Sequence, residues 1–139
     1  MPAPDRSGFT AFHTTTVTVE GGRLAHGRAS GRARSADGTL QLDFRLPAEL
    51  GGEGGGTTPE QLFAAGYAAS FHATLSVLAR ETGADPAALT VTVTVAVGPD
   101  PAGAGSVLRT EIAVAWPGVG DVRRLVERAK TLCPYAKLG

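Results

Sequence analysis

The sequence predicts an α+β domain in which antiparallel sheets surround one long apolar helix. Strand-like alternation of apolar and polar residues occurs on both sides of a central segment, and that segment is apolar on nearly every helical face. The predicted order of elements is βββ-α-ββ-α. A chain of 139 residues and 14.1 kDa is long enough for one core, so we expect a single domain over residues 1–139, with residues 1–11 as a flexible N-terminus.

The N-terminal third predicts three antiparallel strands. Residues 12–19 alternate β-branched side chains, and residues 23–34 are placed to pair with them as a hairpin. Residues 40–46 alternate leucine or phenylalanine with polar residues and stop at Pro47, which is typical of a half-buried strand. The glycine-rich stretch 51–56 is interpreted as a connector.

The central helix is predicted to run from Pro59 to about Arg80. Thr58 is suited to cap it and Gln61 to complete a capping box. Residues 62–79 are almost uncharged and form the only candidate membrane segment, but interrupting polar residues favour a core helix. Because one sheet cannot cover a helix that is apolar all round, we expect a homodimer.

The C-terminal half predicts a hairpin and a second helix. The segments 90–97 and 107–115 have strand character and are joined by a loop rich in glycine and proline. Apolar residues at helical spacing follow Asp121, a suitable cap, and Pro134 limits this helix just beyond Cys133.

Composition excludes several classes of function. Thirteen Lys+Arg balance thirteen Asp+Glu, so no basic surface for nucleic acid is expected. Cys133 is the only cysteine, which excludes a disulfide framework and a thiolate zinc cluster. The three histidines have no ligand spacing, so no metal is predicted. No export signal is apparent at the N-terminus, and we expect a cytoplasmic protein with no membrane partner.

Four segments together resemble the organic hydroperoxide resistance (Ohr) branch of the OsmC-like proteins. The run Thr58 to Phe71, TPEQLFAAGYAASF, is similar to the central helix of that branch. The segments 35–38, 47–52 and 133–135 resemble three further Ohr segments in the same order, and the likeness covers about residues 13–135. It implies an intertwined homodimer, a thiol peroxidase that reduces organic hydroperoxides to alcohols in oxidative-stress defence. The C-terminal strand of the family is expected to be missing.

The resemblance also implies roles for particular residues. A cysteine of the central helix attacks the peroxide, and the matching position here is Ser70. An arginine of the N-terminal hairpin stabilises the thiolate; this role falls to Arg28, with Arg23 and Arg32 as alternatives. The family's glutamate, which orients the arginine, matches Glu60. The resolving cysteine matches Cys133, and a dithiol such as a lipoylated protein reopens the disulfide, with no bound cofactor.

Ser70 blocks the chemistry of the family. A serine alkoxide is scarce at neutral pH and forms no sulfenic acid, so the chain as written should not turn over hydroperoxides. Ser70 is either an engineered replacement in a peroxidase or native to a non-redox paralogue that acts as an enzyme or a binding module for a hydrophobic small molecule. By default, a serine inside a helix hydrogen-bonds the carbonyl four residues earlier, here that of Gly66.

Overall fold

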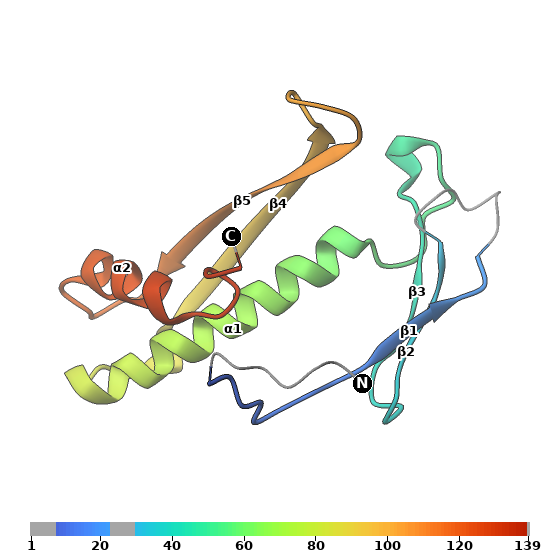
Figure 1. The fold of residues 1–139 in the computed structure, drawn as a ribbon. Helices are drawn as coiled ribbons and strands as arrows, with labels where there is room; N and C mark the ends of the chain where they lie inside the picture. Colours follow the sequence, from blue (N-terminus) through green and yellow to red (C-terminus); the bar gives the residue numbers. More distant parts are fainter. Residues whose placement is uncertain (1–7, 23–29, 139) are drawn as a thin grey trace. The chain divides into compact units, whose positions relative to one another are not determined.

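The computed structural model describes residues 8–22 and 30–138, and its chain divides into two compact units, residues 1–58 and 59–139. Each unit contains one antiparallel sheet, and the long helix belongs to the second unit (Figure 1). The order of strands and α-helices confirms the predicted βββ-α-ββ-α arrangement. The α+β fold is therefore confirmed, whereas a single domain over the whole chain stays a prediction.

The first unit is a three-stranded sheet with the order β1-β2-β3. It consists of β1 (Val17–Glu20), β2 (Gly31–Ser35) and β3 (Gln41–Phe44), all paired antiparallel, followed by a 3-10 turn at Ala48–Leu50. Val19, Ala33 and Leu42 are aligned across the strands and share one face. Ala33 is fully buried on that face, so the predicted alternation does separate an apolar side from a polar one.

The first strand is shorter than predicted, because it begins at Val17 and not at Phe12. Its partner β2 ends at Ser35, which pairs with Val17, and the chain then turns. Thr16 still accepts one hydrogen bond, from the N–H of Ala36 at 2.9 Å, but the residues before it find no strand to pair with in the described part of this unit. Residues 23–29 of the predicted second strand lie outside the described residues.

The turn between β2 and β3 is held by the carboxylate of Asp37. Its Oδ1 accepts hydrogen bonds from Ser35 Oγ at 2.6 Å and from Thr39 N and Oγ1 at 3.0 and 2.8 Å. These bonds, that of Ser35 foremost, favour the charged form and lower the pKa of Asp37 from 3.8 to about 2.

The second unit contains the remaining elements at nearly the predicted positions. They are α1 (Pro59–Thr82), a 3-10 turn (Pro86–Ala88), β4 (Thr90–Pro99), β5 (Ser106–Ala115) and α2 (Val122–Leu132). Helix α1 begins at the proline that suits a first helical position. Asp121 is the N-cap of α2, and its Oδ1 accepts from the N–H of Arg124 at 3.2 Å.

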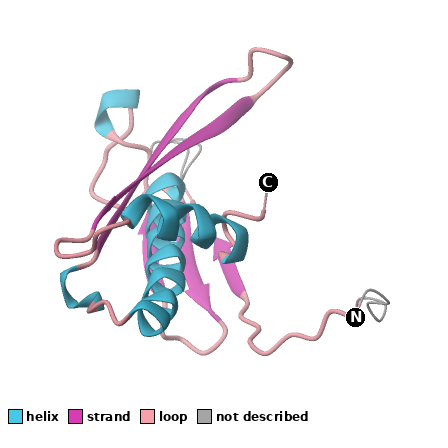
Figure 2. Cartoon of the chain, turned by 90° about the vertical axis from the view of Figure 1, so that its left-hand side faces the viewer, coloured by secondary structure: helices cyan, strands magenta, loops and turns pink. Residues whose placement is uncertain are grey.

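The core of the second unit is built on one side of α1. Tyr67, Phe71, Leu75 and Leu78 recur at spacings of three and four residues and are buried. The β4–β5 hairpin lies along α1 and α2 lies across it (Figure 2). The buried side of α1 meets the valines and isoleucine of the hairpin and the apolar residues of α2, which are Val91, Val93, Ile112, Val114, Leu125 and Ala129.

The opposite side of α1 is exposed, although the helix is apolar there too. Ala65, Ala69, Ala73 and Val77 follow one another at intervals of four residues on this side. By length and composition α1 meets the requirements for crossing a membrane, with a mean hydropathy of 1.4 over its most apolar 18 residues. Core helices of globular proteins meet the same requirements, and the packing of Phe71 and Leu75 favours that reading.

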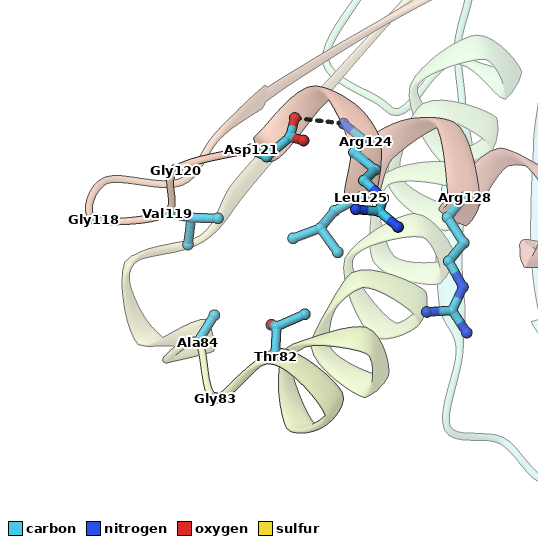
Figure 3. A pocket seen from close by; sticks show the side chains of 10 residues that line it. All are labelled: Thr82, Gly83, Ala84, Gly118, Val119, Gly120, Asp121, Arg124, Leu125 and Arg128. Carbon is cyan, nitrogen blue, oxygen red and sulfur yellow. Dashed lines mark hydrogen bonds between the residues drawn. The ribbon is translucent and has the colours of Figure 1, made fainter.

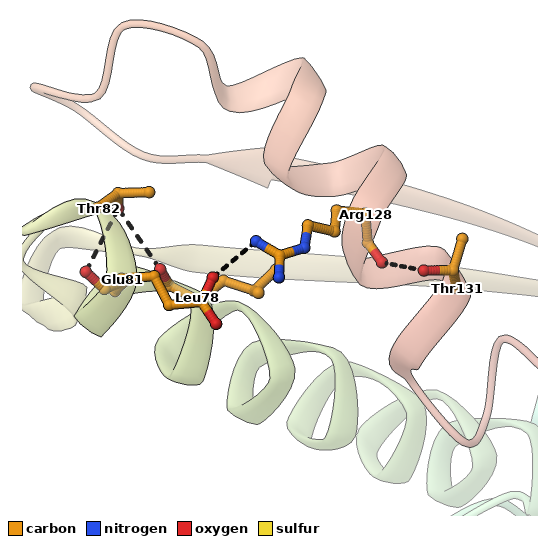
Figure 4. Close-up of polar contacts among 6 residues, drawn as sticks. Leu78, Glu81, Thr82, Arg128 and Thr131 are labelled. Carbon is orange, nitrogen blue, oxygen red and sulfur yellow. Dashed lines mark hydrogen bonds and ion pairs between the residues drawn. The ribbon is translucent and has the colours of Figure 1, made fainter.

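An ion pair joins the two helices at their outer edge. Arg128 Nη1 of α2 lies 2.6 Å from Glu81 Oε2 of α1 (Figure 4). Both side chains are about half exposed, so the pair adds little to stability.

The carboxylate of Asp37 predicts a specific dependence of stability on acid. Because the folded-state pKa is lowered to about 2, its contribution is present above about pH 4 and is lost as the pH falls toward 2. The variant Asp37→Asn should therefore have a lower free energy of unfolding at pH 6. Its free energy of unfolding should also decline less than that of the unmodified chain between pH 4 and 2. Urea unfolding at several pH values measures both effects.

Asp100→Asn is the matched control, because the Asp100 carboxylate accepts a single turn N–H, from Ala102, at 2.9 Å. An unchanged acid dependence in Asp37→Asn would contradict the role assigned to this turn.

Candidate functional site

The structure brings Ser70 and Cys133 together across 63 residues of sequence. Ser70 lies in the middle of α1, and Cys133 is the C-cap of α2, where its N–H is bonded to Ala129 O at 2.8 Å. Ser70 Oγ and Cys133 Sγ are 3.5 Å apart, within reach of a hydrogen bond to sulfur. Cys133 is fully buried and Ser70 half-buried, so the pair lies at the edge of the core.

The default expectation for Ser70 is wrong. Its hydroxyl contacts the thiol of Cys133 and not the carbonyl of Gly66. Bonding to the carbonyl four residues earlier occurs instead at Thr74, whose Oγ1 donates to Ser70 O at 3.0 Å, and at Ser76. Ser70 differs from them because α2 ends beside it and supplies a tertiary partner.

Aromatic rings cover this end of the α1–α2 contact. Tyr135 lies two residues after Cys133, and its ring centroid is 5.7 Å from that of Tyr67 and 6.1 Å from that of Phe63. Phe63 and Tyr67 meet edge to face at 6.0 Å, and Tyr67 is 6.5 Å from Phe71. These distances are those of favourable aromatic pairs. The Ser70–Cys133 pair therefore adjoins a wall of aromatic rings.

Gly66 makes room for one of these rings. A Cβ at this position would lie 2.8 Å from the hydroxyl oxygen of Tyr135, closer than van der Waals contact allows. A glycine inside a helix costs about 1 kcal/mol relative to alanine. Here that cost is matched by a function, since the missing side chain lets the segment after Cys133 lie directly against α1.

The phenol of Tyr67 is kept neutral. Burial raises the pKa of Tyr67 above its usual value of 10.0, and the nearby Cys133 adds to the rise, while Lys130 opposes it. Tyr67 therefore contributes an uncharged ring to the wall at physiological pH.

The charged residues predicted for the site are only partly described. Glu60 is the second residue of α1, half-buried, and forms no ion pair with any described residue. Arg32 has other partners: its guanidinium lies 3.1 Å from Asp43 Oδ1 and 3.3 Å from Gln41 Oε1, on the polar face of the first sheet. Arg28 and Arg23 lie outside the described residues, so the arginine of the site stays a prediction.

The remaining candidates do not assemble into a second kind of site. His72 Nδ1 lies 3.4 Å from Ser76 Oγ, not beside Ser70, and Ser76 donates to the carbonyl of His72 at 2.8 Å. Across residues 8–22 and 30–138, no three His, Cys, Asp or Glu side chains are grouped to hold a metal ion. Chemically, the described centre offers one hydroxyl and one thiol in contact.

Comparison with known proteins assigns this chain to a family. The model of the OsmC-like protein family matches residues 52–138. An organic hydroperoxide resistance protein from Xanthomonas axonopodis pv. citri is 38% identical over 138 residues, which cover 98% of this chain and 90% of that protein. The chain belongs to the OsmC-like family.

Solved structures agree with this assignment. A crystal structure of an organic hydroperoxide resistance protein from Legionella pneumophila matches with a TM-score of 0.80 at 34% identity, covering 93% of this chain and 90% of that one. The organic hydroperoxide resistance protein OhrB of Bacillus subtilis matches with a TM-score of 0.77 at 33% identity, covering 92% and 91%. The likeness to the Ohr branch that the sequence motifs predict is thus confirmed.

Sequence reasoning missed the aromatic wall and the function of Gly66. The signal was present in part: Phe63, Tyr67 and Phe71 recur every four residues, which places three rings on one side of a helix. The contribution of Tyr135 depends on where α2 ends relative to α1, which no local pattern encodes.

Gly66→Ala tests whether the space at this glycine positions the thiol. The methyl group should displace Tyr135 and loosen the segment that follows Cys133, so the thiol should react several-fold faster with a maleimide under native conditions. The helix propensity gained at an alanine, about 1 kcal/mol, should keep the protein folded.

Tyr135→Phe supplies the rescue, because it removes the oxygen that would collide. In this background Gly66→Ala should change the rate of thiol labelling much less than it does alone. Equal effects in the two backgrounds would show that Gly66 and the Tyr135 hydroxyl are not coupled.

Proposed function

We propose that this chain has the scaffold of a thiol-dependent peroxidase that reduces organic hydroperoxides, with Ser70 at the position of the reactive cysteine. One observation carries the proposal: Ser70 Oγ lies 3.5 Å from the sulfur of the only cysteine, Cys133. A nucleophile and a resolving thiol need this proximity. The relatives at 38% and 34% identity, named organic hydroperoxide resistance proteins, support the substrate class.

In this proposal the chemistry needs sulfur at position 70. A thiolate there attacks one peroxide oxygen, the O–O bond breaks, and the products are a sulfenic acid and an alcohol once the alkoxide takes a proton. The thiol of Cys133 then attacks the sulfenic sulfur, a disulfide forms and water leaves. An external dithiol is oxidised as it reduces that disulfide. A hydroxyl at Ser70 supports none of these steps, so the chain as written is inert toward hydroperoxides.

The supporting groups have distinct roles in this mechanism. Glu60 at the start of α1 orients Arg28, and the guanidinium of Arg28 stabilises the thiolate by charge. The aromatic wall of Phe63, Tyr67 and Tyr135 receives the apolar part of the hydroperoxide. The protein works in the reducing cytoplasm, where a dithiol such as a lipoylated protein is available, and it needs no bound cofactor.

A second candidate function rests on the same wall. The half-buried rings of Phe63 and Tyr135 beside a half-buried hydroxyl are suited to bind a hydrophobic small molecule without any redox step. In that case Ser70 is native to a binding module or a non-redox enzyme. The two candidate functions differ in one measurable property: whether the chain with a thiol at position 70 has peroxidase activity.

Ser70→Cys should create peroxidase activity. The variant should consume cumene hydroperoxide with dihydrolipoamide as reductant, whereas the unmodified chain should show no turnover above background. A peroxide-treated sample should lose two hydrogens by intact mass, because the new thiol needs to close only from about 3.5 Å to a disulfide length of about 2.05 Å.

Ser76→Cys is the control, since it places a thiol on the same helix away from Cys133. In the Ser70→Cys background, Arg28→Gln should abolish most activity, and Arg32→Gln should leave it nearly intact, because Arg32 is bound to Asp43. A folded Ser70→Cys protein that consumes no hydroperoxide would favour the binding module instead.

The assembly in this proposal is a homodimer, and the exposed face of α1 supports it. This face carries a row of small side chains along which the α1 helices of two copies can approach closely: Ala65, Ala69, Ala73 and Val77. Near the tip of the hairpin, the paired residues Val97 and Leu108 are 41% and 48% exposed. An obligate dimer buries roughly 2,000 Å² or more.

Sedimentation velocity at micromolar concentration should therefore give a dimer. Ala73→Arg should shift it to the 14.1 kDa monomer, because two cations would face each other in the interface. Ala88→Arg, an exposed alanine of the 3-10 turn, should leave the dimer intact. A wild-type monomer would contradict the proposed assembly.

A further inference from the structure

A cavity lies away from the Ser70–Cys133 pair, where α1 ends and α2 begins. It has a volume of about 660 Å³, within the range of small-molecule sites. Figure 3 shows Val119 and Leu125 pointing into it from one side and Thr82 and Ala84 from the other, with Arg124 on the side of α2. All of these residues belong to the second unit.

The walls of the cavity are partly polar and partly apolar. Leu125 is 8% exposed, and Val119 and Ala84 are half-buried. Val119, Leu125 and Ala84 also border the hydrophobic core, so they are held by packing that does not depend on a ligand. The cavity can therefore receive a short apolar group without rearrangement of its walls.

Its charged residues differ in whether they already have a partner. Asp121 caps α2 through the N–H of Arg124, and Arg128 is bound to Glu81 at 2.6 Å. The guanidinium of Arg124 has no ion pair or hydrogen-bond acceptor among the described residues. Arg124 thus presents a cation that has no ion pair among the described residues, beside the apolar side chains of the cavity.

We propose that this cavity binds a small amphiphilic monoanion, a carboxylate on a short apolar tail, with Arg124 holding the carboxylate. A guanidinium presents paired N–H donors that match the two oxygens of a carboxylate. One cation without an ion pair, with the Asp121 carboxylate on the same cavity lining, suits one negative charge and disfavours a dianion such as a phosphate monoester. The apolar tail lies between Val119, Leu125 and Ala84. This site does not involve Ser70 or Cys133.

The chain contains its own reporter for binding. Trp116 is the only tryptophan, is 4% exposed, and donates from Nε1 to the carbonyl of Asp85 at 2.8 Å. Asp85 follows Ala84, and the N–H of Val119 is bonded to Trp116 O at 3.2 Å. A ligand that contacts Ala84 and Val119 should therefore change the fluorescence of Trp116.

The test titrates the full-length, unmodified chain with hexanoate, and with acetate and 1-hexanol as ligands that lack the tail or the charge. Hexanoate should saturate the fluorescence change, shift the NMR amide signals of Val119 and Leu125, and bind at least about tenfold more tightly than either comparison ligand. Arg124→Gln should weaken hexanoate binding about tenfold, the loss expected for one charge-assisted contact.

Arg123→Gln is the matched control, because it removes the same charge from the neighbouring residue, which does not line the cavity. It should change hexanoate affinity less than twofold. The proposal is overturned if the unmodified chain does not bind hexanoate, if the two arginine variants weaken binding equally, or if the shifted amides lie elsewhere. None of these results bears on the peroxidase scaffold.

Discussion

The burial of one side of α1 is the constraint on which the second unit depends. Phe71 and Leu75 are fully buried there, and each contributes about 1.5–3 kcal/mol through removal of its side chain from water. The hairpin and α2 must both lie against this side. Since Leu125 and Ala129 set how α2 lies across α1, the last turn of α2 ends beside residue 70. The contact between Ser70 and Cys133 is thus a consequence of core packing and does not itself hold the fold together.

Local signals sufficed for the helices, while tertiary partners decided the rest. Pro59 and Asp121 mark helix starts that the structure reproduces, because a proline at the first position and a capping carboxylate act within a single turn. The predicted start of β1 at Phe12 was wrong, because a strand extends only as far as its neighbour pairs with it, and β2 ends at Ser35. The predicted partner of Ser70 was wrong for a similar reason. The thiol of Cys133, which Ser70 contacts in place of the local carbonyl of Gly66, comes from the end of α2.

The candidate site shows the same division. That Ser70 and Cys133 belong together was available only through resemblance to a family, since 63 residues separate them and no spacing rule connects them. The resemblance paired positions 70 and 133 in one site, and the two side chains are in contact. It left three candidates for the arginine of that site. Arg32 is paired with Asp43 on the polar face of its sheet, while Arg23 and Arg28 lie outside the described residues, so the arginine of the site stays a prediction. The cavity beside Arg124 had no sequence signature, because it exists only where α1, the loop after β5 and α2 converge.

At position 70 the fold determines how the side chain packs but not how it reacts. Exchange of oxygen for sulfur changes the size of the side chain little, so the packing that selects this helix contact tolerates either atom. Reactivity differs far more, because a thiol ionises near neutral pH and its sulfur can be oxidised to a sulfenic acid, whereas an alcohol does neither. A family fold and a correct contact therefore specify where a peroxidatic thiol would act, while the identity of one atom determines whether it acts. The contacts among Phe63, Tyr67 and Tyr135 do not involve that atom, so the aromatic wall is the same whichever of the two proposed functions the chain has.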